Sequence, residues 1–504
     1  MSRASISTGG IDFPLTENEP TQPQPTDPTT PMHLVVLGDF SGRRSRLAQG
    51  QSPATPKPIA VDKDNFDAVF AGLDVQLHLP VAEQPLQFAA LDDLHPDFIY
   101  QRVGLFDKMR ILKRKLSKTD KFAEAAAEIT AWANYRDESA DTAEPDLALP
   151  QNLLDAVLQQ RDLDTQLAAA PGGDIDRLIK DIVRPFVETK TDPRQPQMLA
   201  AVDAATSDLM RKIMHHSEFQ QLEASWRCLY LLVRRLELDS RLKLFLIDIS
   251  RMEIQADLEA AETLSETRLY KLLVTQQLTP GSIPYSVLVG DYRIADTEAD
   301  ISLARAMAGI AGAANAAWLS GGHERLAGCD AIGTEADPDA WNYTPDAAVR
   351  DAWQQFCKLP EARHLALAAP RFMVRLPYGR RTSTLEHFDY EELSEQDEHG
   401  YYLWGNSAFL IALLLAQSYR QHGWALRPGQ LQTIDNLPLH VHQHDGDTRV
   451  KPCAEVLLTD RAAQQLQQAG LLPIRSVKDA DAVVVPQWCA VASDRAPVRG
   501  RWSD

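Results

Sequence analysis

One hydrophobic run dominates the pattern of the chain: Leu403 to Ala416 contains no charged side chain. A helix built from this run has no polar face, so we expect it to be buried on all sides. A membrane span needs about 20 apolar residues, and this run is shorter and starts with Gly405, Asn406 and Ser407. The pattern therefore predicts the central core helix of a large domain.

Shorter apolar runs predict strands. Leu242 to Ile249 and Tyr285 to Val289 are apolar on both faces, as is typical of central strands covered by helices. His33 to Leu37 has the same pattern and ends in Gly38, Asp39 and Phe40. Further predicted strands are Ile59 to Val61, Val75 to Leu79, Pro85 to Phe88, Phe372 to Leu376, Leu437 to His444, Ala454 to Leu458, Leu472 to Val477, and Ala482 to Val485. The strand from Phe372 to Leu376 is stopped by a turn at Pro377, Tyr378 and Gly379.

Apolar residues at helical spacing predict the helices. Ser217 to Leu236 has a capping box of Ser217 and Gln220 and one apolar stripe that includes Trp226; burial within its own domain is favoured over pairing with a second chain. The other predicted helices are an Asp-capped helix from Phe66, an amphipathic helix over Asp97 to Leu116 with a basic end, a helix over Ile301 to Leu319 that is rich in small residues and ends at Ser320-Gly321-Gly322, and a helix from Asp460 to a cap at Gly470.

Composition shifts divide the chain into five parts. Residues 1–31 hold many Pro, Thr and Gln, which predicts a flexible N-terminal arm. Residues 32–133 form a first α/β region, and 174–490 form a larger one. Between them, residues 134–173 are predicted to be a linker, with an acidic, turn-rich start and a short apolar helix at 152–159. Residues 491–504 are expected to be a loose polar tail.

The bulk composition excludes several classes of protein. With 504 residues, a net charge of −19 and a pI near 5.1, the chain lacks the basic character of a nucleic-acid-binding protein. Its 5 cysteines have no paired CxxC spacing, which favours reduced thiols over disulfides or a zinc site. The first residues lack the apolar run of a signal peptide. We therefore expect a cytoplasmic protein that does not insert into membranes.

Candidate chemistry is sparse. The GDFSGR loop after the first strand could cradle phosphate, but it has neither of the usual glycine spacings, so a structural turn is favoured. His440, His442 and His444 alternate on one face of a strand and could bind zinc or nickel, yet such ligands rarely meet at one ion without a fourth group. The residues alone indicate an acidic α/β protein without a convincing active site or cofactor.

Ordered sequence segments carry a family resemblance. In the larger region these are IMHHSEFQQLEASWRCLYLLV, PYSVLVGDYRI, ISLARAMAGIAGAANAAW, APRFMVRLPYGRRTSTLEHFDYEE, YYLWGNSAF and VKPCAEVLLTDRAAQQLQQAGLLPI. This region, from about Asp174 to Cys489, resembles the large subunit of the bacterial type VI secretion contractile sheath. The first region resembles the small sheath subunit through VVLGDFSGR, IAVDKDNFDAVFAGL and LQFAALDDLHPDFIYQRVGLFDKM. The two subunits, usually separate proteins, are here joined in one chain.

The resemblance implies a mixed α/β fold, the contractile-sheath protomer, in which the small region packs with the larger body. It also implies a structural protein without catalysis or cofactor, which associates with itself or other sheath subunits, with an inner-tube protein and with baseplate components. Core and assembly positions carried by the matching motifs are Gly38, Asp39, Phe40, Trp226, Gly290, Asp291, Pro377, Tyr378, Gly379, Trp404, Gly405 and Asn406.

Fusion changes one expectation of the family. The short apolar helix with Leu153, Leu154, Asp155, Val157 and Leu158 is similar to a large-subunit helix that an ATP-driven ring unfoldase recognises, but here it is internal. The linker either allows neighbouring protomers to exchange strands or prevents ordinary polymerisation. Three hypotheses follow: a fused sheath protomer, a sheath-like accessory component at the baseplate or sheath end, and a metal-dependent enzyme that uses His440, His442 and His444.

Overall fold

The computed structural model describes residues 27–51, 54–82, 84–118, 120–133, 194–393, 399–444 and 447–503. Residues 1–26 of the expected arm and the whole predicted linker 134–173, with its helix at 152–159, lie outside these residues. The chain forms two compact units, the first from residues 1–91, 216–377 and 395–504, and the second from residues 92–215 and 378–394. Each unit therefore combines segments of the small-subunit-like region with segments of the large-subunit-like region.

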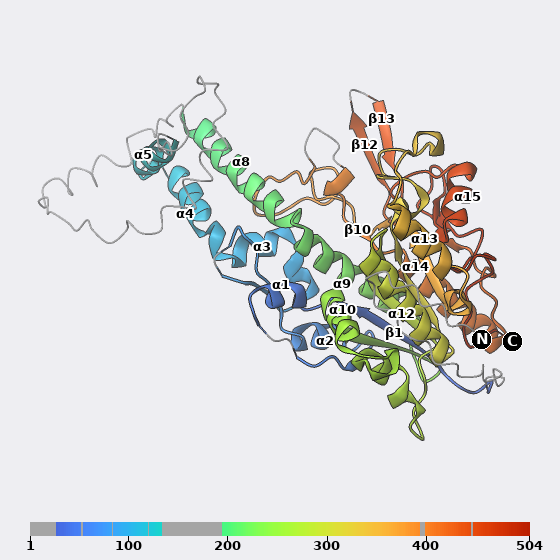
Figure 1. Cartoon of the computed structure of the whole chain (residues 1–504). Coiled ribbons are helices and arrows are strands. Elements are labelled where there is room, and N and C mark those ends of the chain that lie inside the picture. The colour runs from blue at the N-terminus through green and yellow to red at the C-terminus, as the bar shows by residue number, and fades with distance from the viewer. Residues whose placement is uncertain are drawn as a thin grey trace, which may run out of the picture. The chain divides into compact units, whose positions relative to one another are not determined.

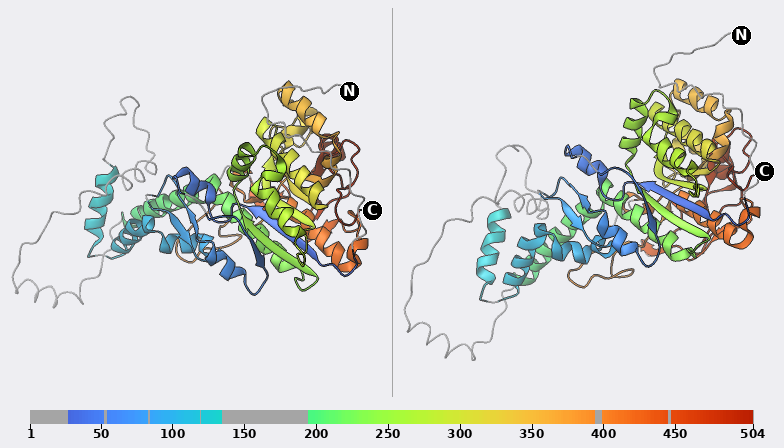
Figure 2. Two further views of the ribbon diagram at one scale, coloured as in Figure 1. Left: turned by 60° about the horizontal axis from the view of Figure 1, so that its bottom comes forward. Right: turned by 90° about the horizontal axis from the view of Figure 1, so that it is seen from below.

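The first unit is built on a seven-stranded sheet in the order β14-β8-β7-β6-β1-β5-β2. All neighbours in this sheet are parallel except the edge strand β2, which runs antiparallel to β5. The strands are β1 (Met32–Gly38), β2 (Pro58–Val61), β5 (Leu242–Asp248), β6 (Val287–Ile294), β7 (Ala317–Gly322), β8 (Leu365–Ala369) and β14 (Leu471–Pro473). Figure 2 shows the blue strand β1 lying beside green strands from much later in the chain.

Helices cover this sheet (Figure 1). The core helix α14 (Ala408–His422) packs against β6, β7, β8 and α9 (Ser217–Arg235), and its residues from Ala408 to Ala416 are all buried. The predicted central core helix is thus confirmed, although it begins at Ala408 and not at Leu403. The remaining α-helices of this unit are α1 (Arg43–Ala48), α2 (Phe66–Gly72), α10 (Arg251–Ala260), α11 (Arg268–Leu273), α12 (Glu298–Ala314), α13 (Ala347–Phe356) and α15 (Asp460–Gln468).

Small sheets complete the first unit. They pair β3 (Val75–Leu77) with β4 (Leu86–Phe88), β9 (Phe372–Met373) with β10 (Trp404–Gly405), β12 (His440–His444) with β13 (Asp447–Lys451), and β11 (Thr433–Ile434), β16 (Val483–Val484) and β15 (Arg475–Ser476) in that order. The predicted strand over Ala454 to Leu458 is wrong, because Ala454 makes only an isolated bridge to Phe372. The predicted strand over Leu472 to Val477 is divided between β14 and β15.

The second unit is mainly helical. It contains α3 (Pro96–Arg102), α4 (Asp107–Leu116), α5 (Phe122–Ala133) and α8 (Gln195–Met214), of which α4, α5 and α8 pack against one another. Residues 378–393 lie along this bundle: the Ser207 hydroxyl donates a 3.0 Å hydrogen bond to the carbonyl of Asp389, and Arg211 Nε donates one of 3.0 Å to that of Glu391. In the described part of the chain, no helix is long and apolar enough to cross a membrane.

The single helix expected over Asp97 to Leu116 is wrong. Val103 adopts an extended conformation, with φ −81° and ψ 120°, and a short 3₁₀ turn over Gly104–Phe106 follows before α4 begins. Glycine and β-branched valine are poor helix formers, and together they break the run even though its apolar spacing continues.

The helix expected over Ile301 to Leu319 is also partly wrong. Helix α12 ends at Ala314, because Asn315 adopts the left-handed conformation with φ 48° and ψ 45°. Asparagine tolerates this conformation better than most residues, so it ends helices as glycine does. The apolar residues that follow, including Ser320, Gly321 and Gly322, form the buried strand β7.

Two predicted helix caps and the predicted tail differ from the structure. Helix α9 is capped by His216, whose Nδ1 accepts a 3.3 Å hydrogen bond from Glu218 N, and Gln220 instead donates to the carbonyl of Gly400. Asn65, at the start of α2, makes no side-chain cap. The expected loose tail is wrong for residues 490–503, since Val491 N donates to the Leu365 carbonyl at 2.9 Å and Val498 is buried.

Candidate functional site

Strand β1 joins the two regions of the chain. It lies between β5 and β6, with all seven residues from Met32 to Gly38 paired in parallel register with Leu242 to Asp248. On its other side, Leu34 to Leu37 pair with Val287 to Gly290. Six of the seven residues are apolar or glycine, which allows burial on both faces. A segment of the small-subunit-like region is therefore an interior strand of the large body's sheet; we call this junction the seam.

An aromatic cluster packs against the seam. The Trp226 ring on α9 lies 5.2 Å from Phe40, 5.6 Å from Phe66 and 4.3 Å from Phe70, measured between ring centroids. Its indole Nε1 donates a 2.8 Å hydrogen bond to the carbonyl of Phe40. The cluster thus buries a tryptophan of the later region among three phenylalanines of the earlier one, and its polar atom is paired.

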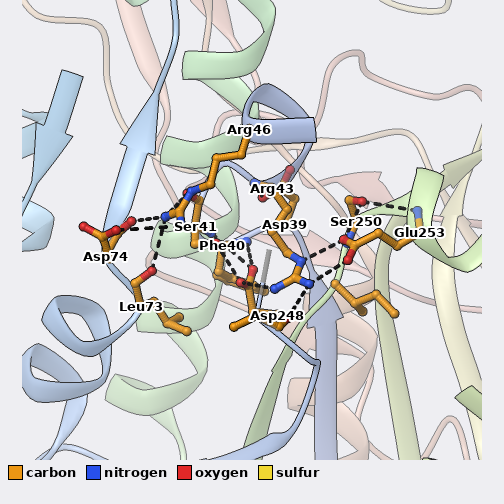
Figure 3. A network of polar contacts seen from close by, with 12 residues as sticks. Asp39, Phe40, Ser41, Arg43, Arg46, Leu73, Asp74, Asp248, Ser250 and Glu253 are labelled. Atoms are coloured by element: carbon orange, nitrogen blue, oxygen red, sulfur yellow. Dashed lines mark hydrogen bonds and ion pairs between the residues drawn. The ribbon is translucent and has the colours of Figure 1, made fainter. Parts of the chain in front are cut away.

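A buried polar network ties the end of β1 to the end of β5 (Figure 3). The Asp248 carboxylate accepts hydrogen bonds from Phe40 N at 2.8 Å, from Ser41 N at 3.2 Å and from the Ser41 hydroxyl at 2.7 Å. Arg43 pairs with Asp248 at 3.2 Å and donates two hydrogen bonds, of 2.7 and 2.6 Å, to Glu253. We call Arg43, Asp248 and Glu253 the clasp.

The clasp is positioned by local structure on both sides. Ser250 and Glu253 form a capping box at the start of α10, which fixes the Glu253 carboxylate beside Arg43. Burial is the largest influence on the pKa of Glu253 and would raise it, but the hydrogen bonds from Arg43 and Ser250 and the charge of Arg43 together hold this pKa below its usual value. The Arg43 side chain is only 4% exposed, so its charge is compensated mainly by the two carboxylates.

Two further carboxylates lie at the ends of β1 and β6. Asp39 accepts hydrogen bonds from Arg43 N at 2.6 Å and Arg44 N at 2.7 Å, yet burial raises its pKa to about 6. Asp291 accepts a 2.5 Å hydrogen bond from the Ser225 hydroxyl, and burial raises its pKa as well. A raised pKa means that these carboxyl groups lose their protons less readily in the folded protein than they would in water.

Glycines allow the strand ends to approach closely. A Cβ atom on Gly38 would lie 3.0 Å from Asp291 Cβ, and one on Gly290 would lie 2.6 Å from the Ser320 hydroxyl oxygen. In the register of β1 and β6, Gly290 pairs with Leu37 and Gly38 is the next residue, so both predicted core positions lie where larger residues do not fit.

The Trp404-Gly405-Asn406 motif lies near the same end of the sheet. Asn406 Nδ2 donates to the carbonyls of Gly290 at 3.3 Å and Tyr292 at 3.2 Å, while its Oδ1 accepts from Ala408 N at the start of α14. A Cβ atom on Gly405 would lie 2.6 Å from Cys228 Sγ. The cavity beside Asp291, Trp404 and Asn406 measures about 80 Å³, which is room for only a few water molecules.

The Pro377-Tyr378-Gly379 motif is divided between the units. Pro377 ends a segment of the first unit, whereas Tyr378 and Gly379 belong to the second. There Tyr378 is buried, and its ring lies 4.8 Å from that of His95. Its backbone N donates a 2.8 Å hydrogen bond to Glu392. The structure therefore does not bring these two residues into the seam, and the candidate unfoldase residues Leu153 to Leu158 lie outside the described residues.

The histidine strand packs by aromatic contacts. His440 is buried, its Nδ1 lies 2.9 Å from the Tyr402 hydroxyl, and its ring stacks on His442 at 5.0 Å. Among the residues that the structure describes, no group of three or more His, Cys, Asp or Glu side chains is arranged to hold a metal ion. Packing of the β12–β13 hairpin is enough to explain the positions of His440 and His442.

Sequence reasoning missed the clasp. Arg43 stands in the GDFSGR loop, which was considered only as a phosphate cradle or a turn, and its partners lie 205 and 210 residues away. One available signal was the Ser250-x-x-Glu253 capping box directly after a predicted strand, because such a box fixes a carboxylate at the strand's carboxyl end.

The comparisons with known proteins agree with this division of the chain. A family model described as EvpB/VC_A0108, tail sheath N-terminal domain, matches residues 196–489. A second, described as Type VI secretion system, VipA, VC_A0107 or Hcp2, matches residues 21–130. The Type VI secretion system sheath protein TssC1 of Pseudomonas aeruginosa PAO1 is 31% identical over 294 residues, which cover 56% of this chain and 58% of the relative. The chain therefore belongs to the EvpB/VC_A0108 tail sheath family and carries a VipA-type region in the same polypeptide.

Proposed function

We propose that this chain is a structural subunit of a type VI secretion contractile sheath that supplies the small and the large part of one protomer as a single polypeptide. The observation that carries the proposal is the position of β1 between β5 and β6. Because both regions share one sheet, the fused chain contains both parts of a complete protomer.

A sheath needs contacts between copies, and no covalent catalysis. One surface of a protomer meets a different surface of the next, and such a heterologous contact grows an open tube. Contraction then draws on the difference in free energy between two packings of the same subunits. The interior of the protomer must hold together throughout, and the buried Trp226 cluster and the clasp suit that task.

The partners follow from this role. The protein would assemble in the cytoplasm around an inner-tube protein, with other sheath subunits and baseplate components. Neighbouring copies would interlock by adding strands to each other's sheets, which uses main-chain hydrogen bonds. The segment from Leu153 to Leu158 is the candidate site for an ATP-driven ring unfoldase.

Co-expression with the cognate inner-tube protein tests the proposal. Electron micrographs of the purified assembly are expected to contain sheathed tubes, and mass spectrometry of those tubes should find this chain in equal copy number with the tube protein. A few copies at one end of a sheath made of other subunits would support the accessory role at the baseplate. Only monomeric protein under every such condition would contradict both assignments.

Two variants at neighbouring residues test whether the clasp at the seam is needed for tube formation. Arg43→Met leaves the carboxylates of the buried Asp248 and the half-buried Glu253 without their cation, and we expect fewer or no tubes. Arg44→Met changes the neighbouring residue, whose side chain is 65% exposed, and should leave tube formation intact. Equal tube yields from both variants would show that the clasp is not required for assembly.

A further inference from the structure

The end of α4 carries an exposed basic face. Arg114, Lys118 and Lys121 are all exposed, and in the described part of the chain none of them forms an ion pair with a carboxylate. Arg114 lies in the last turn of α4, and Lys118 and Lys121 follow in the connection to α5, where Lys118 N donates a 3.1 Å hydrogen bond to the Lys115 carbonyl and Lys121 N one of 3.0 Å to the Lys118 carbonyl. The nearby Ile111 is 42% exposed and adds an apolar contact one turn earlier. We call Ile111, Arg114, Lys118 and Lys121 the basic face.

The other cations of this helix are already paired. Lys113 lies 2.6 Å from Asp203 on α8, and Lys115 lies 3.0 Å from Glu124 on α5. The helix dipole favours Lys and Arg near a helix C-terminus. This accounts for one or two cations, but not for the additional exposed cations of the basic face. These exposed cations contrast with the net charge of −19 of the whole protein.

An acidic stretch of the same chain follows helix α5 in the sequence. Helix α5 ends at Ala133, and residues 137–146 then contain five carboxylates, Asp137, Glu138, Asp141, Glu144 and Asp146, without a single Lys or Arg. The chain also returns beside the basic face, because Gln195 at the start of α8 donates a 2.6 Å hydrogen bond to the carbonyl of Leu116.

The lengths allow the stretch to reach the face. Helix α5 packs against α4 and, at about 1.5 Å per residue, spans about 18 Å. The residues from Ala133 to Asp141 can extend to about 28 Å, so Asp141 and the later carboxylates can return along the whole of α5 to Lys118 and Lys121. Because both partners belong to one chain, their effective concentration is high.

We propose that the basic face of α4 binds the acidic stretch 137–146 of its own chain. The contact would fix the start of the joint between the two regions on the helical bundle of the second unit. This inference does not depend on the role as a sheath subunit.

Limited proteolysis of the full-length chain tests the proposal. A glutamyl endopeptidase cuts after Glu138, and mass spectrometry follows the rate of cleavage of the Glu138–Ser139 bond. In low salt, about 20 mM, we expect the triple variant Arg114→Ser, Lys118→Ser, Lys121→Ser to be cut about 3-fold to 10-fold faster than the wild type. In about 0.5 M salt, where exposed charges are screened, the difference should disappear.

Two further variants make the result specific. Lys63→Ser, Lys358→Ser, Lys478→Ser removes three exposed cations of the first unit and should be cut at the wild-type rate. A charge exchange, Arg114→Asp, Lys118→Asp, Lys121→Asp with Asp137→Lys, Asp141→Lys, Asp146→Lys, should restore protection. Equal rates for wild type and triple variant in low salt would overturn the proposal. Protection that grows with protein concentration would overturn it too, because the stretch of a second copy would then be the occupant.

Discussion

The indole N–H of Trp226 donates a 2.8 Å hydrogen bond to the carbonyl of Phe40, across 186 residues of sequence. Both residues are fully buried, and one belongs to the large-subunit-like region and the other to the small. This contact joins the two regions at a fully buried point, so substitutions there report directly on the seam.

Replacing Trp226 should therefore destabilise the first unit in two steps. Trp226→Phe leaves the Phe40 carbonyl without its donor, which costs about 1–3 kcal/mol. Trp226→Ala also removes the ring that three phenylalanines contact, and we expect a loss of about 3–5 kcal/mol. The midpoint of urea unfolding, followed by circular dichroism, measures both. Equal midpoints for the two variants would mean that the ring contributes nothing beyond its hydrogen bond.

The clasp predicts an asymmetry between two adjacent arginines. Arg43→Met should lower the free energy of unfolding by about 3–5 kcal/mol, since the buried Asp248 and the half-buried Glu253 lose their cation. Arg44→Met should change it by less than about 1 kcal/mol, because the side chain of Arg44 is exposed. The same unfolding experiment compares them. A small effect of Arg43→Met would show that solvent or another cation reaches Asp248 and Glu253.

Asp39 predicts a specific pH dependence. Its pKa is raised from 3.8 to about 6, so the folded state binds a proton between these values more readily than the unfolded state. The contribution of Asp39 to stability is thus fully present below pH 3.8 and is lost as the pH rises through about 6. Asp39→Asn should be more stable than the wild type at pH 7.5, and this advantage should shrink toward pH 4. Unfolding midpoints across this range measure it, and a difference independent of pH would contradict the raised pKa.

Two glycines should respond to alanine in opposite ways. A Cβ on Gly290 would lie 2.6 Å from the Ser320 hydroxyl and 2.8 Å from Trp318 Nε1, so Gly290→Ala should destabilise by about 1–3 kcal/mol. Gly72 lies in α2 with nothing within 4 Å of an added Cβ, so Gly72→Ala should stabilise by about 0.5–1 kcal/mol. Thermal unfolding of the two variants checks both signs. If Gly290→Ala unfolds at the wild-type temperature, the strand ends are less tightly packed than described.

The seam also predicts that the covalent joint is dispensable once the protein has folded. A protease site inserted between Pro150 and Gln151 should allow cleavage into two fragments that still co-elute in gel filtration, because β1 remains between β5 and β6. Co-elution should persist in about 1 M salt, since the contact is mainly apolar. Separation of the fragments without denaturant would contradict the interior position of β1.

Local patterns in the sequence predicted the strongest elements of the fold. The charge-free run around α14 and the apolar stripe of α9 are both buried as expected, because burial follows directly from hydrophobic spacing. The end of α12 at Asn315 was not predicted, since alanine and glycine continue on both sides and periodicity alone cannot separate a buried helix from a buried strand. The clasp could not be predicted, because Arg43 and Glu253 meet only through the pairing of β1 with β5.

The interior place of β1 also sets the order of events during synthesis. β1 leaves the ribosome early, but its neighbour β6 follows only roughly 250 residues later, which at about 5–20 residues per second takes about 10–50 s. Until β5 has been synthesised this apolar strand has neither of its partners, and until β6 follows it has only one. A nascent chain of this kind therefore exposes an apolar strand that is prone to aggregate during its own synthesis, whereas two separately translated subunits can each complete their synthesis before they meet.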